Sequence, residues 1–169
     1  LKTIVIAATE CPSKQNICFY NVHVIQNREI IEDIHDVTFF ENDYGEGSGR
    51  TNPQVLANLL LAFTKNDLRT DANQETYNKM HGKDTEANQA TLDKDLHQSI
   101  GVAAGMVNLT ASLLGYQTGC CACFDGEKIK SILKTDDEPI VLMGVGIKDE
   151  TLNRRQHHIT HDMIPSFNK

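Results

Sequence analysis

A short polar segment near the start of the sequence, residues 11–16, carries side chains that could hold a ligand. Ser13 supplies a hydroxyl, Lys14 supplies an ammonium, and Gln15 and Asn16 supply carboxamides. Groups of these types hydrogen-bond the polar edge of a heterocycle or a phosphate. Because Pro, Ser and Asn are also ordinary turn residues, the segment taken alone fits a plain turn, and its role depends on what surrounds it.

A second segment, residues 115–124, consists mostly of small residues. Small side chains leave backbone N–H groups accessible, so this segment can donate hydrogen bonds to a ring nitrogen or carbonyl of a ligand. Its three cysteines, Cys120, Cys121 and Cys123, also point to metal binding. The spacing lacks the two-residue gap of common zinc sites and no second cysteine pair follows it, which disfavours a metal.

Adjacent arginines near the C-terminal end, Arg154 and Arg155, form a third group. Guanidinium groups bind oxyanions in a bidentate fashion, so this pair is a candidate phosphate clamp. His157 and His161 follow four residues apart and would share a helix face, as metal ligands can. A solvated polar tail accounts for these histidines more simply.

A fourth group, residues 50–54, is polar and lies directly before an apolar stretch. Asn52 and Gln54 are its amide-bearing members. They form a polar lip that could contact a ligand, although a solvent-exposed loop would have the same composition.

Helices and strands that would position these groups follow from the apolar spacing. Helical spacing predicts helices over residues 3–10, 28–37, 86–114 and 127–133, and alternating or continuous apolar runs predict strands over 19–25, 55–63 and 139–147. Residues 41–52 and 66–83 are expected to be loops, the latter a mobile loop or loose helix, and 148–169 a polar tail. The elements interleave through irregular connections, so α+β is the expected fold class.

The helix over residues 86–114 is unusually slim on one side, where Gly101, Ala104, Gly105 and Ala111 occur. A neighbouring helix or a ligand can therefore approach its backbone closely. Gly115 is well suited to end this helix, because glycine favours the left-handed conformation that follows many helix C-termini.

Length and composition exclude several classes of protein. The chain has 169 residues, 40% of them hydrophobic and 23% charged, which fits one folded domain over residues 1–169. A net charge of −7 argues against nucleic-acid binding, and the apolar run 55–63 is too short to cross a membrane. Five cysteines, an odd number, fit a reducing cytosol better than a disulfide scaffold, so a cytoplasmic location is expected.

Taken together, these segments resemble the FMN-dependent nitroreductase family. The stretch from Ala7 to Ile25, with Pro12-Ser13 and Asn16 within it, is similar to the family's "A…APS…N…W.F.VI" pattern. The polar lip, the buried strand, the long helix ending near Gly115, the small-residue segment, the strand 140–146 and the basic tail follow in the family's order. The resemblance covers nearly the whole chain.

The resemblance implies an α+β nitroreductase-like fold with a central mixed or antiparallel sheet flanked by helices. It implies an intertwined homodimer with FMN at the subunit interface. The implied activity is that of an FMN-dependent oxidoreductase, which takes a hydride from NAD(P)H onto flavin N5 and reduces a nitro, quinone or similar small-molecule acceptor in a ping-pong cycle. The flavin carries this chemistry, so no catalytic side chain is expected.

The same resemblance assigns the cofactor contacts. The first polar segment would touch the isoalloxazine ring and ribityl chain through Pro12, Ser13, Lys14 and Asn16. The small-residue segment would bring backbone N–H groups near flavin N5 and O4 through Cys120, Cys121, Ala122 and Cys123. Asn52 and Gln54 would add polar contacts, and Arg154 or Arg155 would reach the phosphate.

The sequence departs from the family pattern in three respects. Family members usually begin with an Arg-Arg-Ser-like segment that grips the phosphate, whereas this sequence starts at Leu1, so a shortened beginning is expected. Cys18 and Tyr20 stand where Gln and Trp are usual, and Ala122 and Cys123 stand where Glu and Gly are frequent. Two alternatives therefore remain: a flavin-binding protein of this fold with little turnover, and a His/Cys metal-binding protein.

Overall fold

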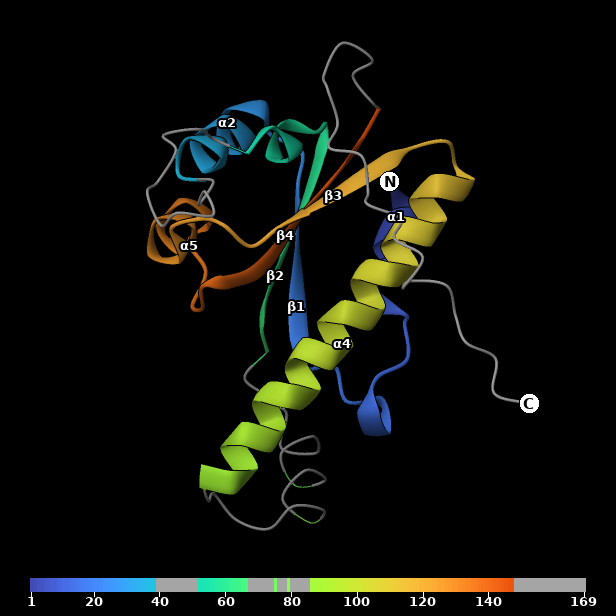
Figure 1. Cartoon of the computed structure of the whole chain (residues 1–169), viewed down its shortest axis with the longest axis vertical. Coiled ribbons are helices and arrows are strands. Elements are labelled where there is room, and N and C mark those ends of the chain that lie inside the picture. The colour runs from blue at the N-terminus through green and yellow to red at the C-terminus, as the bar shows by residue number, and fades with distance from the viewer. Residues whose placement is uncertain (39–51, 67–74, 76–78, 80–85, 148–169) are drawn as a thin grey trace, which may run out of the picture.

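A computed structural model gives the fold of the chain over residues 1–38, 52–66, 75, 79 and 86–147 (Figure 1). Helices and strands interleave along the sequence, as the α+β prediction requires. The helices are α1 (Lys2–Thr9), α2 (Arg28–Asp36), α4 (Glu86–Leu113) and α5 (Gly126–Leu133). The strands are β1 (Tyr20–Ile25), β2 (Leu59–Lys65), β3 (Gln117–Cys121) and β4 (Pro139–Gly146), and two 3₁₀ turns are η1 (Lys14–Asn16) and η2 (Pro53–Leu56).

The strands form one antiparallel sheet in the order β1-β2-β4-β3. Leu61 in β2 pairs with Val24 on one side and with Met143 on the other. The sheet is thus antiparallel throughout its described strands, which resolves the prediction of a mixed or antiparallel sheet. Every residue of β2 except Lys65 is buried, because both edges are paired and both faces are covered.

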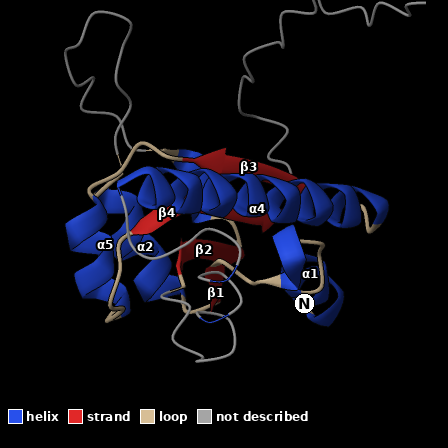
Figure 2. Ribbon diagram, turned by 90° about the horizontal axis from the view of Figure 1, so that it is seen from below, coloured by secondary structure: helices blue, strands red, loops and turns tan. Residues whose placement is uncertain are grey.

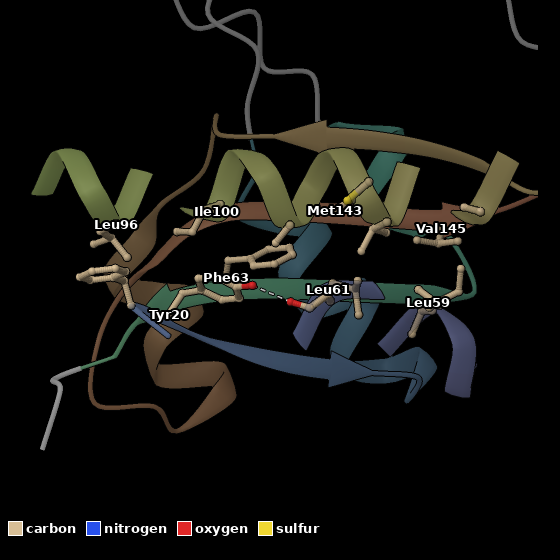
Figure 3. Packing of buried hydrophobic residues seen from close by; sticks show 14 of the residues in the cluster. Tyr20, Leu59, Leu61, Phe63, Leu96, Ile100, Met143 and Val145 are labelled. Carbon is tan, nitrogen blue, oxygen red and sulfur yellow. Dashed lines mark hydrogen bonds between the residues drawn. The ribbon is translucent and has the colours of Figure 1, made fainter. Parts of the chain in front are cut away.

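Alternate residues of β2 face two different cores. Leu59, Leu61 and Phe63 pack in one cluster with α1, α4 and β4. Figure 3 shows them along β2, with Phe63 toward the end where Leu96 and Ile100 of α4 lie and Leu59 at the other end beside Val145. Leu60 and Ala62 belong to a second cluster with buried residues of α2 and α5. Because successive strand residues point to opposite faces, the uninterrupted apolar run serves both layers. Figure 2 shows α2 and α5 together at one side of the view and α1 at the other side.

Helix α4 ends as predicted. Gly115 has a φ of +82°, the N–H of Tyr116 donates to the carbonyl of Ala111 at 2.8 Å, and the N–H of Gly115 donates to the carbonyl of Ser112 at 3.0 Å. These bonds make a Schellman motif, which satisfies carbonyls that the last helical turn leaves unpaired. Within the described residues, no helix combines the length and apolar character needed to span a bilayer.

Helix α4 carries two apolar stripes. The buried one packs on the sheet and comprises Leu96, Ile100, Ala103, Val107 and Ala111. The other one, here called the outer stripe, is exposed and comprises Val102, Met106, Leu109 and Leu113. Its members are spaced by three or four residues and so share one side of the helix. A Cβ built at Gly101 or Gly105 would meet nothing within 4 Å, which leaves this part of the helix open to a neighbour.

Two predictions of secondary structure were wrong in part. The strand expected over 55–63 begins only at Leu59, because the Asn52 side chain accepts the N–H of Gln54 and Pro53 starts a 3₁₀ turn there. Strand β3 was not expected, because its residues show no alternation of apolar and polar side chains. The predicted loops at 41–52 and 66–83 lie almost wholly outside the described residues, and the tail 148–169 lies entirely outside them.

Candidate functional site

Turn η1 follows helix α1 and presents the first group of predicted ligand contacts. Gln15 and Asn16 have φ values of 50° and 58°, in the left-handed region that residues with a Cβ rarely adopt. The N–H of Asn16 donates to the carbonyl of Ser13 at 3.0 Å, and the N–H of Ile17 donates to that of Lys14 at 3.0 Å. Asn16 is exposed and Ser13 is half-buried, so their polar groups are available at the surface.

Lys14 does not point freely outward from this turn. Its Nζ lies 2.6 Å from Oδ2 of Asp95 on helix α4, and the Asp95 side chain is only 6% exposed. The ammonium therefore has a carboxylate partner within the chain. Sequence reasoning placed Lys14 against a cofactor and gave no signal for Asp95, which lies far away in the sequence.

The flanks of η1 are anchored around Tyr20. Its hydroxyl donates to the carbonyl of Ala8 at 2.7 Å and lies 2.9 Å from Sγ of Cys11. Burial, together with the contact to Cys11, raises the pKa of Tyr20 far above its ordinary value. The hydroxyl therefore stays protonated and keeps joining α1 to β1.

A second group of predicted contacts meets at η2. Asn52 is buried and donates its backbone N–H to Oγ1 of Thr38 at 2.9 Å. Its side chain forms a hydrogen bond with the sulfur of Cys121. Burial raises the pKa of the Cys121 thiol, which donates to the carbonyl of Cys123 at 3.6 Å. Asn52 thus ties η2 to the end of strand β3.

Gln54 lies over two glycines of the sheet, Gly119 and Gly144. A Cβ at Gly119 would lie 2.7 Å from Oε1 of Gln54, and a Cβ at Gly144 would overlap its backbone carbonyl oxygen. The exposed Gln54 side chain is therefore seated against strand β3. The sequence predicted separate cofactor contacts for Gln54 and for the small-residue segment, and the structure places Gln54 beside Gly119 of that segment.

The small-residue segment divides into buried and exposed parts. Cys121 is buried, whereas Cys120, Ala122 and Cys123 are exposed. Ala122 and Cys123 follow β3 and precede the bridge between Thr38 and Phe124, outside regular sheet structure. Both residues are thus exposed and follow the strand that contacts η2, where a ligand could reach them.

The predicted contacts at η1 and those at η2 lie far apart within one chain. Turn η1 precedes β1, whose first residue Tyr20 pairs with Lys65 at the end of β2, whereas η2 leads into the start of β2 at Leu59. A strand of this length spans about 20 Å. Figure 1 likewise shows η1 and η2 toward opposite ends of the sheet.

The available donors fit a flavin ring better than a metal. Hydroxyl, amide and backbone N–H groups match the oxygen and nitrogen atoms along the polar edge of an isoalloxazine. Among the residues that the structure describes, no group of three or more His, Cys, Asp or Glu could hold a metal ion. Arg154 and Arg155, the predicted phosphate contacts, lie outside the described residues.

Comparisons with known proteins agree on one family. A model of the nitroreductase family matches residues 1–147. A nitroreductase family protein of Streptococcus pneumoniae superposes with a TM-score of 0.66 at 18% identity, over 98% of this chain and 88% of that one. No curated protein sequence gives a significant match.

Two further solved structures share the fold. A candidate NAD(P)H:FMN oxidoreductase of Staphylococcus epidermidis has a TM-score of 0.66 at 21% identity, over 99% of this chain and 84% of that one. An enone reductase of gut-bacterial fatty acid saturation has a TM-score of 0.63 at 18% identity, over 93% of this chain and 81% of that one. At these sequence identities the structural similarity shows a shared fold and nothing more specific.

Proposed function

The chain belongs to the nitroreductase family, and from this premise we propose that it is an FMN-dependent oxidoreductase with NAD(P)H as electron donor. Family membership by itself indicates a flavin-dependent oxidoreductase in general. The cofactor FMN, the donor, and a nitro, quinone or similar small-molecule acceptor reduced in a ping-pong cycle are the finer parts of the proposal.

The observation that carries the proposal is the surface beside η2. There the Gln54 amide lies against Gly119 of β3, and the exposed residues Ala122 and Cys123 follow that strand. Bound FMN would supply the two-electron chemistry between NAD(P)H and the acceptor. The protein's part would be to donate backbone N–H groups of residues 121–123 to the polar edge of the ring, with Asn52 and Gln54 as further partners. Fixed donors of this kind stabilise charge that develops on the ring.

We further propose that two copies of the chain share each cofactor site. The outer stripe of α4 offers an apolar face, with Leu113 80% exposed and Leu109 55% exposed. Burying such a face in a second copy would remove apolar area from water. The separation of η1 from η2 also supports sharing, because turn η1 of one copy would then supply Pro12, Ser13 and Asn16 to the site formed around Gln54 of the other. Arg154 or Arg155 would reach the phosphate.

The five cysteines support the proposal that the protein works in the cytoplasm. All five are free thiols in the structure. Free thiols persist in a reducing compartment.

A flavin titration followed by anaerobic reduction tests the proposed activity. We expect saturable quenching of FMN fluorescence on adding protein, and bleaching of the bound flavin's visible absorbance on adding NADH or NADPH. Reoxidation by a nitroaromatic or a quinone would complete the cycle. Protein that shows no saturable FMN binding would contradict the proposal, whereas binding without reduction would favour the flavin-binding alternative.

A further inference from the structure

The ion pair between Lys14 and Asp95 links the predicted ligand turn to the longest helix. The two residues are far apart in sequence, and their charged atoms lie 2.6 Å apart. The Asp95 side chain is 6% exposed and the Lys14 side chain is 32% exposed. A nearly buried carboxylate needs a partner, because removing it from water without one is costly. Lys14 supplies that partner from η1.

Turn η1 needs support from its surroundings. Its residues Gln15 and Asn16 both adopt left-handed backbone conformations, which residues with a Cβ keep only where other contacts hold them. On one side of the turn the buried side chain of Ile17 holds the chain against the core. On the other side, Lys14 holds it against α4. The two left-handed residues lie between these attachments.

We propose that Asp95 is a positioning residue for the cofactor site: it fixes Lys14, and thereby holds η1 in the conformation that presents Ser13 and Asn16. Lys14 then serves to shape the turn and does not bind the phosphate. This inference rests on the proposed function, since it takes η1 to be a flavin contact.

The affinity for a flavin depends on the fraction of time that η1 spends in its binding conformation. A turn that occupies its binding conformation a tenth of the time binds about tenfold more weakly. The loss applies to any ligand that contacts the turn, whether or not the ligand carries a phosphate. FMN and riboflavin, which differ by the phosphate, therefore separate a positioning role from a phosphate-binding role.

The test compares Asp95→Asn and Lys14→Met with the wild-type protein in fluorescence titrations with FMN and with riboflavin. We expect both variants to lose affinity for both flavins by a similar factor, about tenfold or more. Asp95→Glu should recover part of the loss, and the double variant should be no weaker than the weaker single variant, because the two residues act as a unit. Asp136→Asn, which makes the same charge change at an exposed turn, is the control and should bind both flavins as the wild type does.

The opposite pattern would overturn the inference. If Lys14 bound the phosphate, Lys14→Met would weaken FMN binding and spare riboflavin, and Asp95→Asn would free the ammonium and leave FMN binding unchanged or tighter. Thermal unfolding of each variant identifies a loss of affinity that comes from unfolding alone. The double variant leaves neither charge unpaired, so it stays informative if a single variant is unstable.

Hydrogen exchange of the protein without flavin separates this inference from the proposed function. The N–H groups of Asn16 and Ile17, which are bonded within the turn, should exchange faster in Asp95→Asn than in the wild type. Equal exchange in the two proteins would refute the bracing role even if FMN binds. Absence of FMN binding by the wild type would refute the proposed function, and the exchange rates would then still decide whether Asp95 braces the turn.

Discussion

Two glycines of the sheet lie against the same residue, Gln54, but against different parts of it. A methyl group at Gly119 would press on the flexible side chain, whereas one at Gly144 would overlap the backbone carbonyl. A side chain can move aside more easily than a packed backbone.

We therefore expect Gly119→Ala and Gly144→Ala to act differently. Gly144→Ala should lower the free energy of unfolding by about 1–3 kcal/mol, because the backbone of η2 must shift. Gly119→Ala should be less destabilising but should displace the Gln54 amide and weaken FMN binding. Chemical denaturation and flavin titration of both variants measure the two effects. Equal loss of stability in the two variants would contradict this account of Gln54.

The thiols at the end of β3 should differ in reactivity. Cys121 is buried and its pKa is raised by that burial, whereas Cys123 is exposed. Because the thiolate is the reactive form, Cys121 should resist alkylation near neutral pH while Cys123 is modified. Timed treatment with iodoacetamide followed by peptide mass spectrometry gives both rates. Faster modification of Cys121 than of Cys123 would show that this part of the sheet is open.

His23 on β1 gives the stability of the protein a pH dependence of known sign. Burial lowers its pKa below the ordinary value of 6.5, and its ring lies 3.0 Å from Oγ1 of Thr64. Above the unfolded-state pKa, His23 is neutral in both the folded and the unfolded protein, so it does not change the free energy of unfolding. As the pH falls below about 6.5, the unfolded chain takes up a proton that the folded protein resists, so stability declines until the folded pKa is passed.

Substitution isolates that contribution. We expect His23→Gln to lose less stability than the wild type between about pH 8 and about pH 5, because the variant has no titrating group there. Urea unfolding of both proteins across this range gives the difference directly. Parallel curves for the two proteins would exclude His23 as the cause.

At the scale of elements, the end of helix α4 depends on a backbone conformation. Gly115 has a φ of +82°, and a Cβ there would meet no atom within 4 Å, so a substitution changes conformational energy without a clash. We expect Gly115→Ala to destabilise the fold by about 1 kcal/mol and Gly115→Asn to cost less, because Asn tolerates the left-handed region better. Thermal unfolding ranks the three proteins, and an Ala variant as stable as the wild type would contradict the role of the Schellman motif.

Sequence patterns predicted the strongly periodic elements well. Helices α1, α2, α4 and α5 and strands β1 and β4 lie where the apolar spacing placed them. Strand β3 was missed because its strand character comes from pairing with β4, which local propensity does not report. The start of β2 was predicted too early, because Val55 and Leu56 are apolar but belong to the 3₁₀ turn that the Asn52 side chain caps.

The candidate site was predictable in its parts but not in its arrangement. Asn52, Gln54 and the segment around Cys121 were identified by residue type, and the structure brings them together. The partner of Lys14 could not be found, because Asp95 comes from a helix whose rotation is set by packing on the sheet. The distance between η1 and η2 also depends on strand register, which a single sequence does not specify.

At the scale of the whole molecule, the outer stripe of α4 should decide the oligomeric state. Leu109→Asp places a charge in the middle of this exposed apolar face. We expect the variant to shift a dimer toward monomer and to weaken FMN binding with it, because each cofactor site is proposed to need two copies. Light scattering after size-exclusion chromatography measures the shift.

Ala90→Asp, at an exposed position of the same helix, is the matched control. It introduces the same charge but should leave the dimer intact, because it lies outside the outer stripe. A wild-type protein that is monomeric at all accessible concentrations, or a Leu109→Asp variant that remains dimeric, would contradict the proposed interface.

The pairing of β2 with β4 also fixes when the chain can fold during its synthesis. Leu59 pairs with Val145, and residues 66–138 lie between the two strands. A ribosome that has released β1 and β2 has released two strands with an apolar surface and no third strand to complete the sheet. Helix α4 can form early, since its contacts are local, but the sheet waits until residues 139–146 leave the exit tunnel. A nascent chain stalled before that point would expose β2 to chaperones and to other chains.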